Sequence, residues 1–395
     1  MIAFFKSFIV SGANIAGPVL LLIVFQKITN PEIFINNYRN YYNVTFLSTF
    51  ITLQAQATML RRNFGNSLQN DLIYFVKRSF HNLFYGVIIG VILFLILNDI
   101  LFPTTKAIDF IYCLISAYFF QIFQGIINIL NRRRSLNYQI FSILLFYLVQ
   151  LILILILAQV TPNSNTLRIF VIVFASTLLL LLIYQIRQAR TTTYQENEDA
   201  LKLYERWLVP HVVSAYLLAN YERIYIINHF EYQLSYEFIL LSQFIMLLSV
   251  VPMTINRIIV PKIFDGEIHL GKDKIKKVGY LLAAFFLLFM TYAAVISFIF
   301  TEVLYYQSIT DWRIFFIMSL LQYLNMIYLI LITFLHHKYD TFSISIITVS
   351  ISVFYLACLN IFAIESILGV VTIALAAKFI QIVAVSCKVW PKKHA

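Results

Sequence analysis

Charged residues are scarce in this chain of 395 residues. Asp, Glu, Lys and Arg make up 12% of it, whereas hydrophobic residues make up 61%. A soluble domain usually carries about 25% charged residues. The sequence also contains many apolar runs of about 20 residues, the length that crosses a bilayer core. This balance predicts a polytopic membrane protein and excludes an ordinary soluble domain.

Several chemical signatures are also missing from the sequence. The three cysteines, Cys113, Cys358 and Cys387, lie in apolar runs at spacings that fit neither a metal site nor a disulfide framework. No Gly-x-x-x-x-Gly-Lys-Ser/Thr stretch for nucleotide phosphates is present. No loop carries a zinc motif, a nucleophile elbow or the carboxylates of a membrane glycosyltransferase. We therefore expect no metal, no cofactor and no enzymatic activity.

The apolar runs predict an all-α fold with about twelve transmembrane helices. The backbone of each span must satisfy its own hydrogen bonds in lipid, which requires helices. The first run is longer than the apolar part of a cleavable signal peptide, so we interpret it as a span. The predicted spans are 8–26, 42–60, 83–102, 108–129, 138–159, 167–186, 207–228, 237–260, 279–301, 313–335, 342–363 and 367–387.

Lys and Arg alternate between the predicted loops. Every second loop is rich in them, as at 131–135 and 272–277, whereas the remaining loops hold few, among them Lys27, Arg39 and Arg168. The positive-inside rule then places both termini in the cytoplasm. Topology and attraction to anionic headgroups therefore account for most of the net charge of +11. Nucleic acid is not an expected partner.

The most polar stretch, RQARTTTYQENEDALK at 187–202, divides the spans into two groups of six. We predict an N-terminal six-helix lobe at 1–190, a cytoplasmic linker at 191–205 and a C-terminal six-helix lobe at 206–395. Both lobes start on the cytoplasmic side, so they would be parallel repeats. Such repeats are common among secondary transporters.

Span seven carries ionisable residues where hydrocarbon makes them costly. His211 and Glu222 are eleven residues apart and share one face of a helix, and Pro210 can kink or start that helix. A polar stripe on a broken helix suits the lining of a water-filled cavity. Alternatively, Glu222 and Arg223 form an interfacial pair, with Arg223 reaching the outer headgroups.

Lys378 lies in the middle of the last span, too deep for easy contact with the headgroups. It needs a carboxylate, an anionic substrate group or a cavity. Arg257 lies between two prolines at the cytoplasmic end of span eight, where it could meet a pyrophosphate or simply add positive-inside charge. The other candidates for the pathway are Arg78, Lys6 and Asn14. Cations outnumber acids in this set, so a cavity lined by it would favour an anion.

A longer run, 207–264, combines a proline early in span seven, an acid–arginine pair, an aromatic residue after a short loop and a late proline. These features are Pro210, Glu222-Arg223-Ile224-Tyr225-Ile226, Tyr236 and Pro261. The run resembles the polysaccharide flippases of the O-antigen and capsule type. Their superfamily also contains multidrug and toxin extruders and peptidoglycan-precursor flippases. The first span, SFIVSGANIAGPVLLLIVFQKI, is similar to theirs as well.

The resemblance implies a substrate and a mechanism. The substrate would be a polyprenyl-pyrophosphate-linked oligosaccharide, moved by alternating access from the cytoplasmic to the outer leaflet of the inner membrane during surface polysaccharide synthesis. A polysaccharide polymerase is a candidate partner. The residues that would hold the pyrophosphate or acidic sugars are Arg257, Lys378, Arg223, Arg78, Lys6 and Asn14. Glu222 and His211 would couple transport to protons.

A twelve-span solute transporter of the major facilitator type shares the predicted layout and is the alternative. Its second loop usually carries a glycine, an acid and paired basic residues at set spacing. Here that loop reads LRRNFGNSLQND at 60–71, with the basic residues before the glycine. A polymerase or ligase of the same polysaccharide would need a large outer loop, which the predicted spans do not leave room for.

Overall fold

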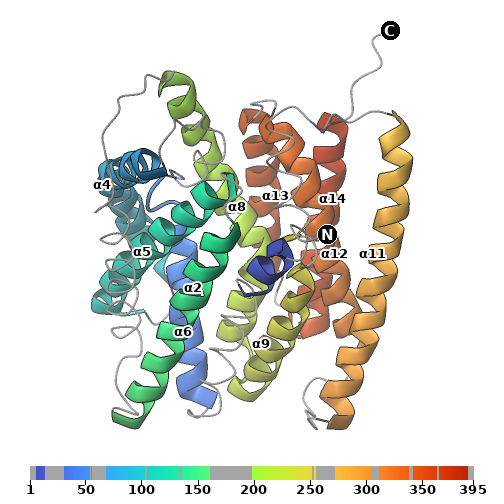
Figure 1. Cartoon of the computed structure of the whole chain (residues 1–395). Coiled ribbons are helices and arrows are strands. Elements are labelled where there is room, and N and C mark those ends of the chain that lie inside the picture. Colours follow the sequence, from blue (N-terminus) through green and yellow to red (C-terminus); the bar gives the residue numbers. More distant parts are fainter. Residues whose placement is uncertain are drawn as a thin grey trace. The chain divides into compact units, whose positions relative to one another are not determined.

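The structure is a computed structural model of the chain (Figure 1). It describes residues 6–13, 31–53, 55, 68–102, 105–132, 136–160, 198–250, 253–254, 272–303, 311–337, 341–362 and 364–389. Within these ranges every regular element is a helix. The chain divides into two compact units, Met1–Val213 and Ser214–Ala395, which are described separately below.

The predicted multi-pass membrane architecture is confirmed in the described part of the chain. Five helices are long and apolar enough to cross a membrane: Asp71–Leu97, Ala107–Leu130, Trp312–Thr333, Thr341–Ile361 and Ile367–Lys388. On the first of these, large apolar side chains such as Leu95 and Phe84 are exposed. A bilayer would cover this face, because hydrocarbon is the solvent that matches it. The chain is therefore a multi-pass membrane protein.

The first unit is built around α4 (Leu68–Leu101), α5 (Ala107–Arg132) and α6 (Leu136–Val160). The rings of Phe123 and Phe146 stack at 3.9 Å between α5 and α6. The ring of Phe75 from α4 lies directly over Gly125, where any side chain would collide with it. The span predicted at 108–129 is confirmed, and the one predicted at 138–159 is helical over its whole length. Helix α4 starts before its predicted span 83–102, because it continues through the polar turns around Lys77 and Arg78.

Helix α2 (Pro31–Ser48) corrects the predicted second span at 42–60. Proline suits the first helical position, where no backbone N–H is needed. The helix ends early because Ser48 and Thr49 hydroxyls donate to carbonyls three residues back, Ser48 at 2.6 Å and Thr49 at 2.7 Å, and a turn follows. Arg39, predicted in a loop, lies inside this helix.

The turn after α2 packs against α4. The Asn82 side-chain amide donates to the Thr52 carbonyl at 3.1 Å. One turn further along α4, Gly86 touches the backbone of Ile51 so closely that no Cβ would fit. Leu53 has a φ of 47°, which is uncommon for a residue with a side chain. Close backbone contact therefore fixes the position at which the chain leaves α2.

Helix α8 (Glu198–His229) runs without interruption through Pro210. Of the two roles predicted for Pro210, a kink or a start of the helix, the start does not apply, because α8 begins at Glu198, within the stretch predicted as a linker. The boundary between the two units falls inside α8, after Val213. The C-terminal half of α8, from Ser214 onward, belongs to the second unit. The predicted span 167–186 lies outside the described residues.

Beyond α8, the described part of the second unit holds seven further elements. They are α9 (Tyr232–Met246) with the 3-10 turn η1 (Leu247–Ser249), α11 (Lys272–Phe298) with the π turn η2 (Ile299–Val303), α12 (Trp312–His337), α13 (Thr341–Ile361) and α14 (Ile367–Val389). The spans predicted at 313–335, 342–363 and 367–387 are confirmed. Within the predicted span 237–260, the α-helix α9 ends at Met246 and η1 follows. Helix α11 begins before the predicted span 279–301 and ends at Phe298, where η2 follows.

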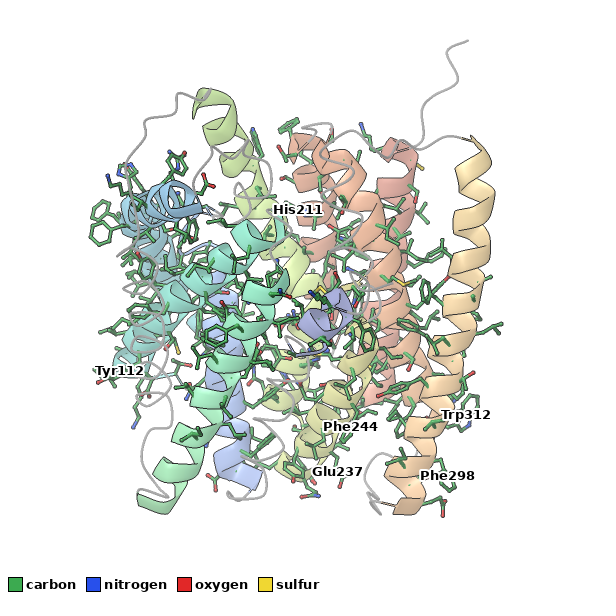
Figure 2. All side chains as sticks on the ribbon, in the orientation of Figure 1. Tyr112, His211, Glu237, Phe244, Phe298 and Trp312 are labelled. Carbon is green, nitrogen blue, oxygen red and sulfur yellow. The ribbon has the colours of Figure 1, made fainter. Side chains whose placement is uncertain are left out.

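One end of the second unit carries exposed aromatic residues. Phe298 and Trp312 both lie there, and both side chains are largely exposed (Figure 2). Aromatic residues of this kind are enriched at membrane–water interfaces. Next to Trp312, the Asp311 carboxylate accepts three bonds from the Arg313 side chain, at 2.7, 2.9 and 3.0 Å, and one from its backbone N–H. Hydrogen bonds from Arg313 hold the pKa of Asp311 below its ordinary value.

Candidate functional site

Two charged residues of α8 are buried inside the second unit. Glu222 has none of its surface exposed, and Arg223 only 2%. The surrounding segment, from Leu217 to Ile227, is otherwise rich in buried apolar side chains. The interfacial interpretation of this pair is therefore wrong, because neither side chain reaches the surface.

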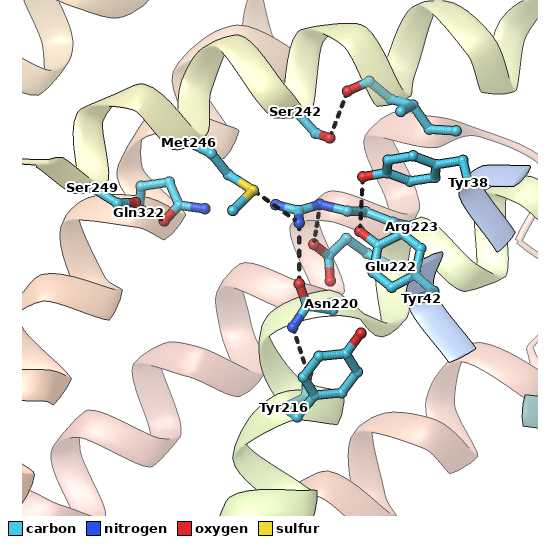
Figure 3. Close-up of polar contacts among 11 residues, drawn as sticks. Tyr38, Tyr42, Tyr216, Asn220, Glu222, Arg223, Ser242, Met246, Ser249 and Gln322 are labelled. Carbon is cyan, nitrogen blue, oxygen red and sulfur yellow. Dashed lines mark hydrogen bonds and ion pairs between the residues drawn. The ribbon is translucent and has the colours of Figure 1, made fainter. Parts of the chain in front are cut away.

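Contacts of the Arg223 guanidinium include groups on α8 and α9 (Figure 3). Its Nη1 donates to Asn220 Oδ1 at 3.1 Å and contacts the sulfur of Met246, on α9, at 3.3 Å. Its Nε lies 3.5 Å from Glu222 Oε1. Asn220 is itself anchored, since its amide donates to the Tyr216 carbonyl at 3.0 Å. The arginine thus reaches from α8 to α9.

Lys378 of α14 is the second buried cation, with 2% of its surface exposed. Its ammonium donates to Gln381 Oε1 at 2.9 Å. It also lies 4.3 Å from the centre of the Tyr328 ring on α12, a cation–π contact. The prediction that Lys378 lies too deep to reach the headgroups is consistent with this burial. Tyr328 was not among the predicted site residues.

Glu222 is coupled electrostatically to both buried cations. The charges of Arg223 and Lys378 both act on its carboxylate, and so does the hydroxyl of Tyr355 on α13. No described side chain donates a well-aligned hydrogen bond to either Glu222 oxygen. A buried carboxylate is costly unless it is paired and hydrogen-bonded. The acid is therefore held in place by charge rather than by a fixed set of hydrogen bonds.

A polar contact between α8 and α13 adjoins this charged group. The Asn360 amide donates to the Tyr221 hydroxyl at 3.0 Å. The rings of Tyr221 and Tyr355 meet edge to face, with 6.3 Å between their centres. Sequence reasoning missed Tyr355 and Asn360. Their only signal was a tyrosine and an amide in an otherwise apolar span, which is also typical of contacts that merely join helices.

We define Glu222, Arg223 and Lys378, with Tyr328 and Tyr355, as the buried charge cluster. It joins α8, α12, α13 and α14 within one unit. With all three charged groups ionised, two cations face one acid. Protonation of Glu222 would leave two cations opposed by none, so the charge of this carboxyl controls the electrostatic energy of the cluster. Such a group can bias how four helices pack.

The other predicted site residues are distributed differently. His211 is buried on α8, three turns before Glu222, and falls within the first unit. Arg78, on α4, and Lys6 are half-buried, also in the first unit. Asn14 and Arg257 lie outside the described residues. Among the described residues no three His, Cys, Asp or Glu side chains gather closely enough to hold a metal ion.

No protein-family model and no curated protein sequence matches the chain. Solved structures do match it over nearly its full length. One is the outward-facing conformation of a multidrug resistance MATE family transporter of the MOP superfamily. It has a TM-score of 0.63 and 11% identity over 98% of this chain and 93% of that one.

Two further matches are crystal structures of MATE. The complex with MaL6 has a TM-score of 0.63 at 10% identity, and the complex with MaD3S a TM-score of 0.62 at 12% identity. Each covers 98% of this chain and 94% of the other. The chain has the fold of the MATE transporters. That fold places twelve membrane helices in two lobes, as predicted from the sequence.

Proposed function

We propose that the protein is a transporter of the MOP superfamily that flips a polyprenyl-pyrophosphate-linked oligosaccharide across the inner membrane. The observation that carries this proposal is the buried charge cluster inside a MATE-type fold. Buried ionisable groups within membrane helices usually belong to substrate or ion pathways. The fold supports transport, and the resemblance of 207–264 to polysaccharide flippases supports the substrate.

The geometry favours a coupling role for the cluster. Arg223 and Lys378 are buried and engaged by groups of their own unit, so neither offers a surface to a large headgroup in this conformation. Glu222 can gain or lose a proton, and the two cations respond to its charge. We infer that loading and release of this proton shifts the equilibrium between inward-open and outward-open states, with His211 on the same helix as a second proton carrier. A ligand can shift such an equilibrium only by its difference in affinity for the two states.

The direction of transport follows from the proposed substrate. The lipid-linked oligosaccharide is made on the cytoplasmic side and used on the outer side, where a polysaccharide polymerase would receive it. The prenyl tail can stay in the bilayer throughout, so only the headgroup needs a polar path. The protein then performs no bond-making chemistry and is not an enzyme.

Export of small amphipathic molecules is the second candidate. The observation that favours it is the structural likeness to a transporter described as conferring multidrug resistance. The alternative, a solute transporter of the major facilitator type, is less well supported, because the solved structure that matches 98% of the chain has the MATE fold.

A deletion strain tests the proposal. Membranes would be extracted and searched by mass spectrometry for polyprenyl-pyrophosphate oligosaccharide, while surface polysaccharide is stained. We expect a complete repeat unit to accumulate and the surface polymer to disappear. Wild-type chain should restore the polymer, whereas Glu222→Gln, Arg257→Ala and Lys378→Ala should not.

A matched control is Arg313→Gln, which removes a charge from an exposed pair far from any proposed pathway residue in sequence. Unchanged lipid-linked pools together with increased drug sensitivity in the deletion strain would instead support the multidrug function.

A further inference from the structure

We propose that Tyr221, Tyr355 and Asn360 form a gate through which Glu222 exchanges protons with water on the outer side of the membrane. Tyr355 passes the proton, and a hydrogen bond between Tyr221 and Asn360 keeps the gate closed. The proposal rests on the coupling role proposed for Glu222, but it is independent of the substrate. All four residues belong to the second unit.

Glu222 lies close to one end of its helix. It is seven residues before His229, the last residue of α8, which corresponds to about 10 Å of helix. Toward the other end, α8 continues back to Glu198, about 36 Å of helix away. The positive-inside pattern predicts that the His229 end faces the outside. The outer side is therefore the shorter way for a proton to reach Glu222.

Asn360 lies at the same end of the second unit, on α13. It is the second-last residue of that helix, and it is exposed. Its amide donates to the Tyr221 hydroxyl at 3.0 Å, and this hydroxyl can donate to Asn360 Oδ1 at 3.2 Å. Tyr221 itself is only 1% exposed. The contact thus joins α8 to α13 between the exposed end of the unit and the buried acid.

The Tyr355 ring adjoins this contact. It meets the Tyr221 ring edge to face and has none of its surface exposed. Its hydroxyl acts on the Glu222 carboxylate, yet neither the hydroxyl nor the two carboxylate oxygens make a well-aligned hydrogen bond to a described group. Most buried polar side-chain atoms have such a bond. A small rotation of either side chain can therefore join the hydroxyl to the carboxylate or to entering water.

These contacts define how one proton moves. When the gate opens, a hydronium ion from outside gives a proton to the Tyr355 oxygen, while the hydroxyl hydrogen passes to a Glu222 oxygen. Glu222 becomes a neutral acid, the hydronium becomes water, and Tyr355 keeps one hydrogen and no charge. Release follows the same steps in reverse. A hydroxyl can both donate and accept a hydrogen bond, which this role requires.

Other charged and titratable groups surround Glu222 and the gate. Those with described contacts are Arg223, Tyr225 and His229 on α8, Tyr328 on α12 and Lys378 on α14. From α9 the described contact is the sulfur of Met246, which does not titrate. Charged arginine and lysine have no acceptor atom. The Glu222 carboxylate is therefore the group beside Tyr355 that takes up the proton.

Infrared spectroscopy of the full chain in nanodiscs measures proton transfer directly. After a sudden drop in pH, the carbonyl band that appears in wild-type protein and is missing in Glu222→Gln reports protonation of Glu222. We expect Tyr355→Phe to slow this protonation at least about tenfold, since a positioned proton carrier contributes at least that much. The matched control is Tyr323→Phe. It removes a hydroxyl that donates to the Leu282 carbonyl at 3.0 Å in the same unit, and it should leave the rate unchanged.

Two further variants test the hydrogen bond that closes the gate. Asn360→Leu and Tyr221→Phe each remove it, so each should speed protonation of Glu222 about fivefold, the weight of one net hydrogen bond. Because both changes break the same contact, the double variant should be no faster than either single variant. Equal rates for Tyr355→Phe and wild type, or no acceleration in Asn360→Leu and Tyr221→Phe, would overturn the proposal. The last two variants keep Tyr355, so they decide the question should Tyr355→Phe fail to fold.

These readouts separate the gate from the flippase function. A deletion strain without accumulated lipid-linked oligosaccharide would reject the flippase function, while the protonation rates of Glu222 would still reveal the gate. Accumulated oligosaccharide together with unchanged protonation rates in all three gate variants would reject the gate and leave the flippase function intact.

Discussion

At the scale of single residues the charge of Glu222 matters most, because this buried acid is coupled electrostatically to the buried cations Arg223 and Lys378. We predict that Glu222→Gln lowers flipping in cells at least about tenfold, a change of about 1.4 kcal/mol in the controlling free energy. The neutral amide cannot exchange a proton or balance Arg223 and Lys378. Glu222→Asp keeps the charge and should retain more activity than Glu222→Gln. Surface polymer per cell measures both, and full activity of Glu222→Gln would exclude proton coupling through this residue.

The electrostatic coupling of Glu222 to Lys378 can be measured through stability. Removing one partner of a buried pair costs about 3–5 kcal/mol. We therefore expect Glu222→Gln to lower the free energy of unfolding strongly, and the double change with Lys378→Met to recover part of that loss. Urea unfolding of purified protein, as a double-mutant cycle, should give a coupling of about 0.5–3 kcal/mol. Combining Glu222→Gln with Arg313→Gln should be additive, since the exposed pair lies apart from the cluster.

At the scale of elements, Gly86 determines how α4 meets the turn after α2. A Cβ at this position would collide with the backbone of Ile51, which cannot move aside as a side chain can. We predict that Gly86→Ala destabilises the protein by about 1–3 kcal/mol, the usual cost of overpacking. Thermal unfolding in detergent would show it. Gly90→Ala is the matched control on the same helix, because the nearest atom there is the flexible end of Leu114 at 3.0 Å.

The helices that can be predicted from the sequence are those whose position depends on hydropathy alone. Helices α12, α13 and α14 follow continuous apolar runs, and their predicted ends were nearly right. Helix α2 was misplaced because its amides and Arg39 look like a loop when each residue is scored by its own polarity. Packing against α5 satisfies part of that polarity, and a sequence does not show such packing. For the same reason the sequence predicts Lys378 as a deep cation but does not predict its partner Tyr328.

At the scale of the whole molecule, the fold is shared with MATE transporters at only 10–12% identity. The pattern of apolar spans, rather than particular residues, therefore specifies it. The positive-inside pattern predicts that both termini lie in the cytoplasm. A C-terminal green fluorescent protein fusion should fluoresce, and an alkaline phosphatase fusion at the same point should be inactive. The opposite result would invert the topology and the proposed direction of transport.

The place of Lys378 in the chain has a consequence for how the protein is made. Lys378 lies in α14, the last of the described helices to leave the ribosome, while Glu222 and Tyr328 belong to helices synthesised earlier. A lysine at the centre of a membrane helix opposes insertion by about 2.5–3.5 kcal/mol. The Glu222 carboxylate and the Tyr328 ring, which are already in the membrane, would offset that cost once α14 packs into the second unit. Loss of Glu222 would then act first during biosynthesis. Helix α14 would insert into the membrane less efficiently, and quality-control proteases would degrade more of the chain.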